Sequence, residues 1–206
     1  MNRLAALLLS MIMTLMLLAP AAGWVESEAA PAAPDAAKQF EALRQKGILD
    51  GVEDGSAGLH RQMTRAELSA VLVRLLKLKP RSSAPSYEDT GSHWAHEQGY
   101  IEAVTASKLM EGVASRQFDP DGKVTLEQLA ATLVRALGLP AETDPQLTGK
   151  VSGWAAGFVA TARNAKLLSE HPDYTQAATR DILTMALTAA DARLAVPALS
   201  AGPAGD

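Results

Sequence analysis

The sequence contains no cysteine among its 206 residues and little aromatic content, 4%. The lack of cysteine excludes disulfides, thiolate metal sites, cysteine nucleophiles and a lipid-modified cysteine anchor. A basic excess is also missing, since 19 Lys and Arg stand against 23 Asp and Glu, a net charge of −4. We therefore expect no nucleic-acid partner, because such proteins present a basic footprint.

The N-terminal segment has the features of an export signal. A positive start at Arg3 precedes an apolar run from Leu4 to Leu18, and small residues follow around Ala21. This pattern predicts a secretory signal peptide over residues 1–22. The alternative is an uncleaved anchor, although the apolar run is shorter than the roughly 20 residues that span a bilayer. We expect a secreted protein with no stable transmembrane anchor after cleavage, held together by its apolar core alone.

Two further segments lack the periodicity of folded elements. Residues 23–35 are rich in Ala and Pro, which predicts an extended linker. Residues 196–206 are rich in small residues, Pro and Gly, and we expect a flexible tail there. The folded part is therefore expected between these two segments.

The folded part contains an internal repeat with three copies. Thr64, Thr125 and Thr179 are each followed by apolar residues at helical spacing. This pattern predicts a helix with one buried face after each threonine. Glu67 and Gln128 stand three residues after the first two threonines and predict capping boxes. The third copy has Ile182 there, which predicts only half of that cap.

A second helix is predicted upstream of each threonine. In the middle copy it extends from near Trp94 to Leu109-Met110, and in the third from Trp154 to Leu167-Leu168. In the first copy it contains Phe40 and Leu43. Glycines follow in two copies, at Gly51 and Gly112, and suggest turns that need positive φ. The expected fold is therefore all-α, with three helix–loop–helix units.

These patterns together resemble the S-layer homology (SLH) repeat. The middle copy carries the resemblance in the segments Tyr87-Glu88-Asp89, His93-Trp94-Ala95, Ile101, Leu109-Met110-Glu111-Gly112, Phe118-Asp119-Pro120 and Val124-Thr125. The first copy has the signature Thr64-Arg65-Ala66-Glu67, and the third has Gly153-Trp154-Ala155 with Thr179-Arg180-Asp181. The expected repeats are residues 36–80 (degenerate at its start), 86–140 and 147–195 (degenerate).

The resemblance implies both an architecture and a function. SLH repeats form a pseudo-threefold helical spindle, whose inter-repeat grooves bind anionic, pyruvylated secondary cell-wall polysaccharides. The implied location is the cell wall or S-layer, and no cofactor is implied. By the resemblance the signature arginine contributes to the groove, and it matches Arg65 and Arg180. Leu126 stands in the corresponding place in the middle copy, so at most two sites are expected.

The candidate glycan-binding residues are Arg65, Arg180, Glu67, Trp94 and Trp154. A guanidinium can pair with a carboxylate through two hydrogen bonds, and helix N-terminal N–H groups also favour anions. The tryptophans could stack on sugars. The competing interpretation makes each arginine a solvated residue of the first helical turn and each tryptophan a plug in the core. If the first interpretation holds, Arg65→Ala/Arg180→Ala stays folded but no longer binds walls.

Several kinds of catalytic and metal site are disfavoured by the sequence. The segment Asp119 to Val124 looks like a calcium loop, but glutamines occupy the two positions where carboxylates matter most. His93 and His96 lack a third ligand for zinc, and no Gly-x-Ser-x-Gly elbow or phosphate-binding loop is present. We expect no enzyme and no metal site. A second hypothesis remains open, in which the degenerate repeats contact an envelope protein without binding glycan.

Overall fold

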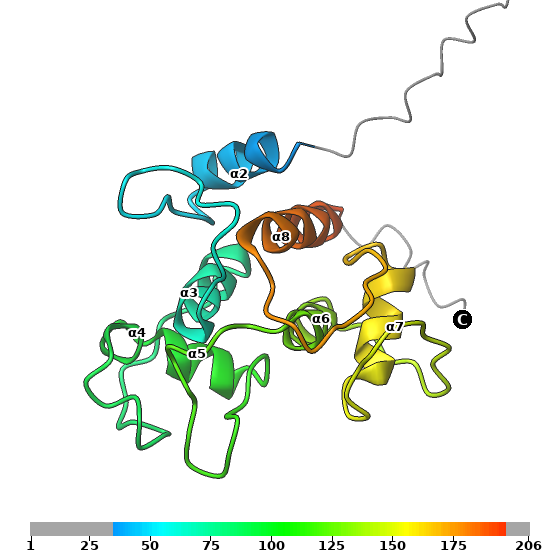
Figure 1. Ribbon diagram of the computed structural model, residues 1–206. Helices are drawn as coiled ribbons and strands as arrows, with labels where there is room; N and C mark the ends of the chain where they lie inside the picture. The colour runs from blue at the N-terminus through cyan, green and yellow to red at the C-terminus, as the bar shows by residue number, and fades with distance from the viewer. Residues whose placement is uncertain (1–34, 197–206) are drawn as a thin grey trace, which may run out of the picture. The chain divides into compact units, whose positions relative to one another are not determined.

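The computed structural model describes residues 35–196, and they confirm the all-α prediction (Figure 1). Extended segments within this range pair only as isolated bridges. The predicted signal peptide, most of the linker and nearly all of the tail lie outside the described residues. The helices are α2 (Ala36–Gln45), α3 (Arg65–Leu75), α4 (Trp94–Glu97), α5 (Tyr100–Ala106), α6 (Leu126–Ala136), α7 (Ala156–Asn164) and α8 (Arg180–Ala195).

Helices α3 and α6 begin with the predicted capping boxes. The Thr64 hydroxyl accepts the N–H of Glu67 at 3.1 Å, and the Glu67 carboxylate accepts the N–H of Thr64 at 2.7 Å. Thr125 and Gln128 make the same pair of bonds, both at 3.2 Å. A cap of this kind stabilises a helix by about 1 kcal/mol. The sequence pattern therefore located the start of both helices correctly.

Helix α8 begins in a different way. The side chain of Thr179 accepts no hydrogen bond from the helix. Its hydroxyl donates instead to the carboxylate of Asp181, which also accepts the N–H of Ile182. The predicted half cap at Thr179 is therefore wrong, because Asp181 takes over the role of acceptor.

The predicted first helix of the middle copy is broken. Gly99 adopts φ +74° between α4 and α5, and a Cβ there would lie 2.6 Å from the backbone nitrogen of Arg81. Only glycine tolerates both the conformation and the close approach. The Leu109-Met110 and Leu167-Leu168 pairs also lie beyond the ends of α5 and α7, so those predicted helices were too long.

Gly51 and Gly112 are required for closeness rather than for positive φ. Neither is among the residues with positive φ, which the helix ends place instead at Gly47, Lys108 and Lys166. A Cβ on Gly51 would lie 2.7 Å from the carbonyl oxygen of Gly55. The prediction of a positive-φ turn at these two glycines is therefore wrong.

Helices pack across the repeats in a cyclic order. The second helix of each repeat contacts the first helix of the next repeat, as α3 does with α4 and α5, and α6 with α7. Helix α8 closes the cycle by packing on α2, the first helix of the described chain (Figure 1). The pairs α3 with α5, α6 with α7 and α2 with α8 therefore each join two sequence repeats, whereas α4 and α5 pack within the middle repeat.

Backbone hydrogen bonds follow the same cyclic order. The first two N–H groups of α3 donate to the carbonyls of Gly122 and Pro120, both at 2.9 Å. Those of α6 donate to Gln176 and Tyr174, and those of α8 donate to Arg61 and Leu59. Each helix start is thus joined to the loop of the following repeat. The spindle itself stays a prediction, and this ring of bonds is the connectivity that it requires.

The apolar core is continuous through all three repeats. Its largest fully buried side chains include Leu68, Phe118, Leu129, Tyr174 and Leu183. The buried positions on α3, α6 and α8 are those of the predicted apolar faces, because residues three and four apart share one side of a helix. Among residues 35–196, no helix is both long enough and apolar enough to cross a membrane.

Candidate functional site

Arg65 is buried and holds the neighbouring repeat. Its side chain is 4% exposed, and its guanidinium stacks over the ring of Phe118 at 4.6 Å. Nε donates to the carbonyl of Phe118 at 2.8 Å and Nη2 to that of Glu111 at 2.6 Å. Burial lowers the pKa of this guanidinium, while Asp119, Tyr87 and Asp89 act in the opposite direction. The side chain is therefore a fixed cation that orders the loop of the second repeat.

Arg180 makes the equivalent contacts one junction away. It is 5% exposed and lies over the ring of Phe40 at 5.8 Å. Nε donates to the carbonyl of Ala57 at 2.9 Å and Nη2 to that of Asp50 at 2.7 Å. Burial is the main cause that lowers the pKa of Arg180. The alternative of a solvated first-turn arginine is therefore wrong for both residues.

The helix N-termini do not offer free N–H groups to an anion as expected. At α3 and α8 the first two N–H groups are bonded to loop carbonyls of another repeat. That Arg65→Ala/Arg180→Ala stays folded remains a prediction. We expect the double variant to lose stability, because each arginine holds two loop carbonyls.

The junction that contains Leu126 is built differently. Leu126 is buried in the core, and the loop of the third repeat is held by Tyr174, which is fully buried. The Tyr174 hydroxyl accepts the N–H of His171 at 3.0 Å and faces the carbonyl of Ser169 at 3.5 Å. Ser169 follows a Leu-Leu pair just as Glu111 follows Leu109-Met110. This junction therefore keeps its loop ordered without a cation.

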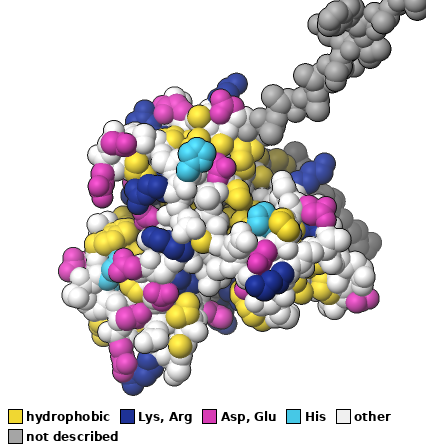
Figure 2. Space-filling model, in the orientation of Figure 1, with side chains coloured by type: hydrophobic (Ala, Val, Ile, Leu, Met, Phe, Trp, Pro, Cys, Tyr) yellow, Lys and Arg dark blue, Asp and Glu magenta, His cyan; other side chains and the backbone are white. Residues whose placement is uncertain are grey.

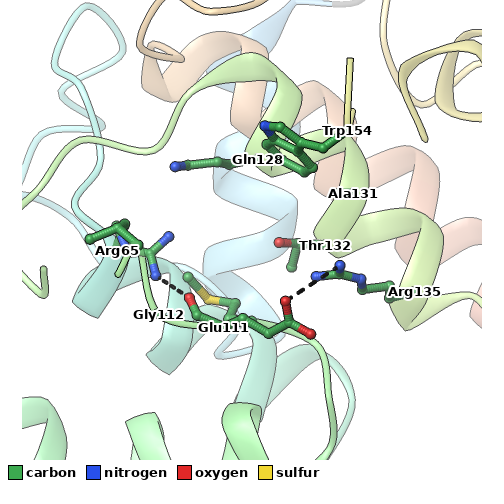
Figure 3. A pocket seen from close by; sticks show the side chains of 10 residues that line it. Arg65, Glu111, Gly112, Gln128, Ala131, Thr132, Arg135 and Trp154 are labelled. Atoms are coloured by element: carbon green, nitrogen blue, oxygen red, sulfur yellow. Dashed lines mark hydrogen bonds and ion pairs between the residues drawn. The ribbon is translucent and has the colours of Figure 1, made fainter. Parts of the chain in front are cut away.

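A pocket of about 320 Å³ lies where all three repeats meet beside Arg65 (Figure 3). Arg65 comes from the start of α3 and Glu111 from the loop after α5. Helix α6 supplies side chains from one face, and the third repeat supplies an indole. The polar and aromatic lining residues are Arg65, Glu111, Gln128, Thr132, Arg135 and Trp154.

Trp154 and Arg135 contribute an indole and a second guanidinium to this pocket. Trp154 is 54% exposed, and Trp94 is 39% exposed, so the interpretation of the tryptophans as core plugs is wrong. Arg135 stacks over the ring of Phe158 at 5.0 Å and faces the carboxylate of Glu111 at 4.0 Å. Because that ion pair is long, the Arg135 guanidinium can form stronger hydrogen bonds with an added anion.

The lining chemistry suits an anionic sugar. An exposed indole offers an apolar face to a sugar ring, and side-chain amide and hydroxyl groups can bond its hydroxyls. The guanidinium of Arg65, which is held by two carbonyls, and that of Arg135, whose ion pair is long, can both attract a carboxylate. Figure 3 shows Arg65 and Arg135 on opposite sides of the pocket, with Trp154 above them.

The predicted residues divide between two junctions. Arg65 and Trp154 line the pocket just described. Glu67 is close enough to Arg180 to raise its pKa electrostatically, against the larger effect of burial. Trp94 begins α4, which packs on α3, the helix of Glu67. Arg180, Glu67 and Trp94 therefore correspond, one repeat earlier in the cyclic order, to the residues around Arg65.

Arg135 was missed in the sequence, although a signal was present. Arg74 and Arg135 both stand ten residues after a capping threonine, at Thr64 and Thr125. The corresponding residue of the third copy is Ala189. A cation that recurs at the same position in two copies could have been identified as a candidate site residue.

Asp89 orders the loop next to the pocket. Its carboxylate accepts the N–H groups of Phe118 at 2.9 Å and Asp119 at 2.7 Å. Partial burial raises the pKa of Asp89, but these hydrogen bonds outweigh it and hold the pKa below its ordinary value. The same carboxylate therefore holds the start of the segment from Asp119 to Val124.

Other kinds of site find little support among the described residues. Within residues 35–196, no three His, Cys, Asp or Glu side chains are placed to hold a metal ion. His93 caps α4 by accepting the N–H of Ala95 at 3.1 Å, and His96 pairs with Glu102 at 2.8 Å. On the face seen in Figure 2, acidic and basic side chains are interspersed.

Comparison with known proteins matches the middle copy to a known domain family. Residues 86–130 match the family model of the S-layer homology domain. The chain is 25% identical over 177 residues to the middle cell wall protein of Brevibacillus brevis, covering 81% of this chain and 16% of that protein. It is 30% identical over 121 residues to an S-layer protein of Bacillus licheniformis, covering 58% of this chain and 14% of that protein.

Some relatives are named as enzymes. An amylopullulanase of Thermoanaerobacterium thermosulfurigenes is 25% identical over 144 residues, covering 65% of this chain and 8% of the enzyme. The chain thus spans less than a fifth of the length of each of these three relatives. The similarity therefore covers only a small part of each relative, and the names of these relatives describe different kinds of protein.

Proposed function

Because the chain carries an S-layer homology domain and is a surface protein of the cell wall or S-layer, we propose that it binds an anionic wall polysaccharide through the pocket beside Arg65. The domain is a cell-envelope anchoring module, and the proposal concerns what it holds. A carboxylate-bearing sugar, such as a pyruvylated one, fits the two guanidiniums. The proposed role is non-catalytic.

The observation that carries this proposal is the chemistry at the junction of three repeats. Trp154 offers an exposed indole, and Arg135 offers a guanidinium whose ion pair with Glu111 is long, at 4.0 Å. Arg65 adds a cation that cannot move away, because two carbonyls hold it. A preorganised cation costs little to order when the ligand arrives, which favours affinity.

Sedimentation with purified cell walls tests the proposal. Arg135→Ala should weaken binding by about tenfold or more, since a charge-assisted hydrogen bond contributes about 1.5–3 kcal/mol. Trp154→Ala should weaken it by a similar factor through the loss of the indole face. Arg116→Ala is the matched control, because Arg116 is 72% exposed and lies outside the pocket. Both pocket variants should keep the unfolding midpoint of the control to within a few degrees.

Walls stripped of their secondary polymer provide the second arm. The proposal predicts that stripped walls no longer retain the wild-type protein. If stripped walls retain it fully, or if both pocket variants sediment like Arg116→Ala, the protein-interaction hypothesis replaces the glycan one. In that case the domain contacts an envelope protein rather than the polysaccharide.

A further inference from the structure

We propose that Glu127 is a positioning residue for Trp154, and that its buried carboxylate holds the indole at the pocket before the wall polysaccharide arrives. Glu127 lies outside the lining of the pocket, so it acts through Trp154 and does not touch the ligand. This inference rests on the proposed function, because it concerns how one binding residue of that pocket is kept in place.

The Glu127 carboxylate holds the residue that opens the turn of Trp154. Its Oε2 atom accepts the N–H of Ser152 at 2.9 Å, and its Oε1 atom accepts the Ser152 hydroxyl at 2.8 Å. The carbonyl of Ser152 accepts the N–H of Ala155 at 2.9 Å, which closes the turn Ser152-Gly153-Trp154-Ala155. Charged hydrogen bonds are among the stronger ones, and two of them to one residue fix its orientation as well as its place.

The rest of the turn shows why this hold matters for the indole. Ala155 is fully buried, whereas Trp154 is 54% exposed. Gly153 is not among the residues with positive φ, and a Cβ on it would meet no atom within 4 Å. Neither conformation nor closeness requires glycine there, so this residue adds freedom to the backbone just before Trp154. The two bonds from Glu127 limit that freedom at the start of the turn.

The middle repeat orders its tryptophan in a different way. Trp94 directly follows His93, whose side chain accepts the N–H of Ala95 at 3.1 Å. Gly153 takes the place of His93 in the third repeat, and the start of α7 has no side-chain cap. The bonds that order the turn of Trp154 come instead from the start of α6, 25 residues away in sequence. A distant residue therefore does in the third repeat what a neighbouring residue does in the middle one.

The helix itself does not require a carboxylate at this position. Ala66 stands at the same place in α3, two residues after Thr64, and that helix begins with the same capping box. Glu127 is 6% exposed, and burial of a carboxylate is unfavourable unless hydrogen bonds compensate it. The N-terminus of α6 offsets part of this penalty, because helix starts favour negative charge. The two bonds to Ser152 account for the rest of its role.

A double-mutant cycle between Glu127 and Trp154 tests the inference in the full chain, with purified cell walls as the probe. Glu127→Ala should weaken sedimentation with walls by about three- to tenfold, as expected when one more side chain must be ordered during binding. In a Trp154→Ala background the same change should have less than about a twofold effect, because no indole is left to order. In an Arg135→Ala background the full effect should remain.

The conservative variant Glu127→Gln should restore binding to within about twofold of wild type. Its amide oxygen can accept the Ser152 N–H, and its amino group can donate to the Ser152 hydroxyl. Glu88→Ala is the control, since the Glu88 carboxylate is 62% exposed and pairs with Arg116. All binding measurements are made below the melting temperature of the least stable variant, so that every protein compared is folded.

The heteronuclear NOE of the indole N–H groups supplies a readout without ligand, because it reports motion on the picosecond-to-nanosecond scale. The value for Trp154 should fall in Glu127→Ala and stay at the wild-type level in Glu127→Gln. The value for Trp94 should be the same in both variants, since His93 orders that turn locally. A merely destabilised fold would not single out one of the two indoles.

The outcomes separate this inference from the proposed function. An equal loss of wall binding on Glu127→Ala with and without the indole of Trp154 would overturn the inference, as would an unchanged NOE of that indole. Both results leave the proposed function standing, because wild type still binds walls. If wild type does not sediment with walls, the proposed function fails, whereas the NOE still decides whether Glu127 holds the indole.

Discussion

The junctions beside Arg65 and Tyr174 both hold a loop of the following repeat in place, but they do so with different side chains. In both, the N–H groups of a helix start donate to the loop of the following repeat, and a buried side chain holds that loop. Arg65 does so with two charged bonds to carbonyls, and Tyr174 with one neutral hydroxyl. Loop order at these junctions therefore does not require a cation.

The comparison also separates structural residues from residues that are free to bind. Arg65 is 4% exposed, and its Nε and Nη2 atoms already bond the protein. Trp154, in the turn before α7, is exposed, and Arg135 on α6 is partly exposed; both line the same pocket. Arg65, the residue of the sequence motif, thus supports the pocket, whereas Trp154 and Arg135 form part of its surface.

Replacing Arg65 is the largest perturbation we predict. Arg65→Ala removes two charged hydrogen bonds to loop carbonyls, one buried and one partly buried, so the free energy of unfolding should fall by about 3 kcal/mol or more. Urea unfolding followed by circular dichroism measures this loss. Arg135 lines the same pocket but does not make two close hydrogen bonds to carbonyls. Arg135→Ala should therefore lower the free energy of unfolding by less than about 1 kcal/mol. Equal losses for the two variants would contradict the division between structural and ligand-facing arginines.

Replacing tyrosine hydroxyls should produce a smaller and graded effect. Tyr174→Phe leaves the His171 N–H without its acceptor at a junction that has no arginine, and should cost about 1–2 kcal/mol. Tyr87→Phe is the matched control, since Tyr87 accepts the Gly112 N–H at 3.0 Å in a loop that Arg65 also holds. We expect Tyr87→Phe to cost less. A reversed order in thermal unfolding would show that Arg65 contributes little to the loop.

The smallest predicted effect is acid sensitivity at the Arg65 junction. Because the folded-state pKa of Asp89 is held below its ordinary value, its contribution is present above the unfolded-state pKa. That contribution is lost as the pH falls through the folded-state pKa. Melting temperatures measured from neutral pH down to about pH 3 should therefore converge for wild type and Asp89→Asn. Parallel curves would exclude this role for Asp89.

The second helices were predictable because their signals are local. Capping residues and an apolar face lie within a single turn or two of chain, and Thr64 and Thr125 begin helices as predicted. The break at Gly99 was not predictable, since it depends on the approach of Arg81 from another segment. The first-helix lengths were overestimated because apolar residues continue past each helix end.

The site was harder to predict than the fold. The carbonyl partners of Arg180 lie 123 and 130 residues away in sequence, so no local pattern reveals that this arginine is buried. The order in which helices pair across repeats is equally long-range. Arg135 acquires its role only when the loop of Glu111 and the indole of Trp154 are placed around it.

The indole N–H resonance of Trp154 provides the most direct test of the central claim, that wall polysaccharide binds in the pocket between repeats. Titrating the protein with purified wall polysaccharide should shift this resonance, and the shift should saturate over the same concentration range as wall sedimentation. A protein that sediments with walls while the Trp154 resonance stays unchanged would contradict the account.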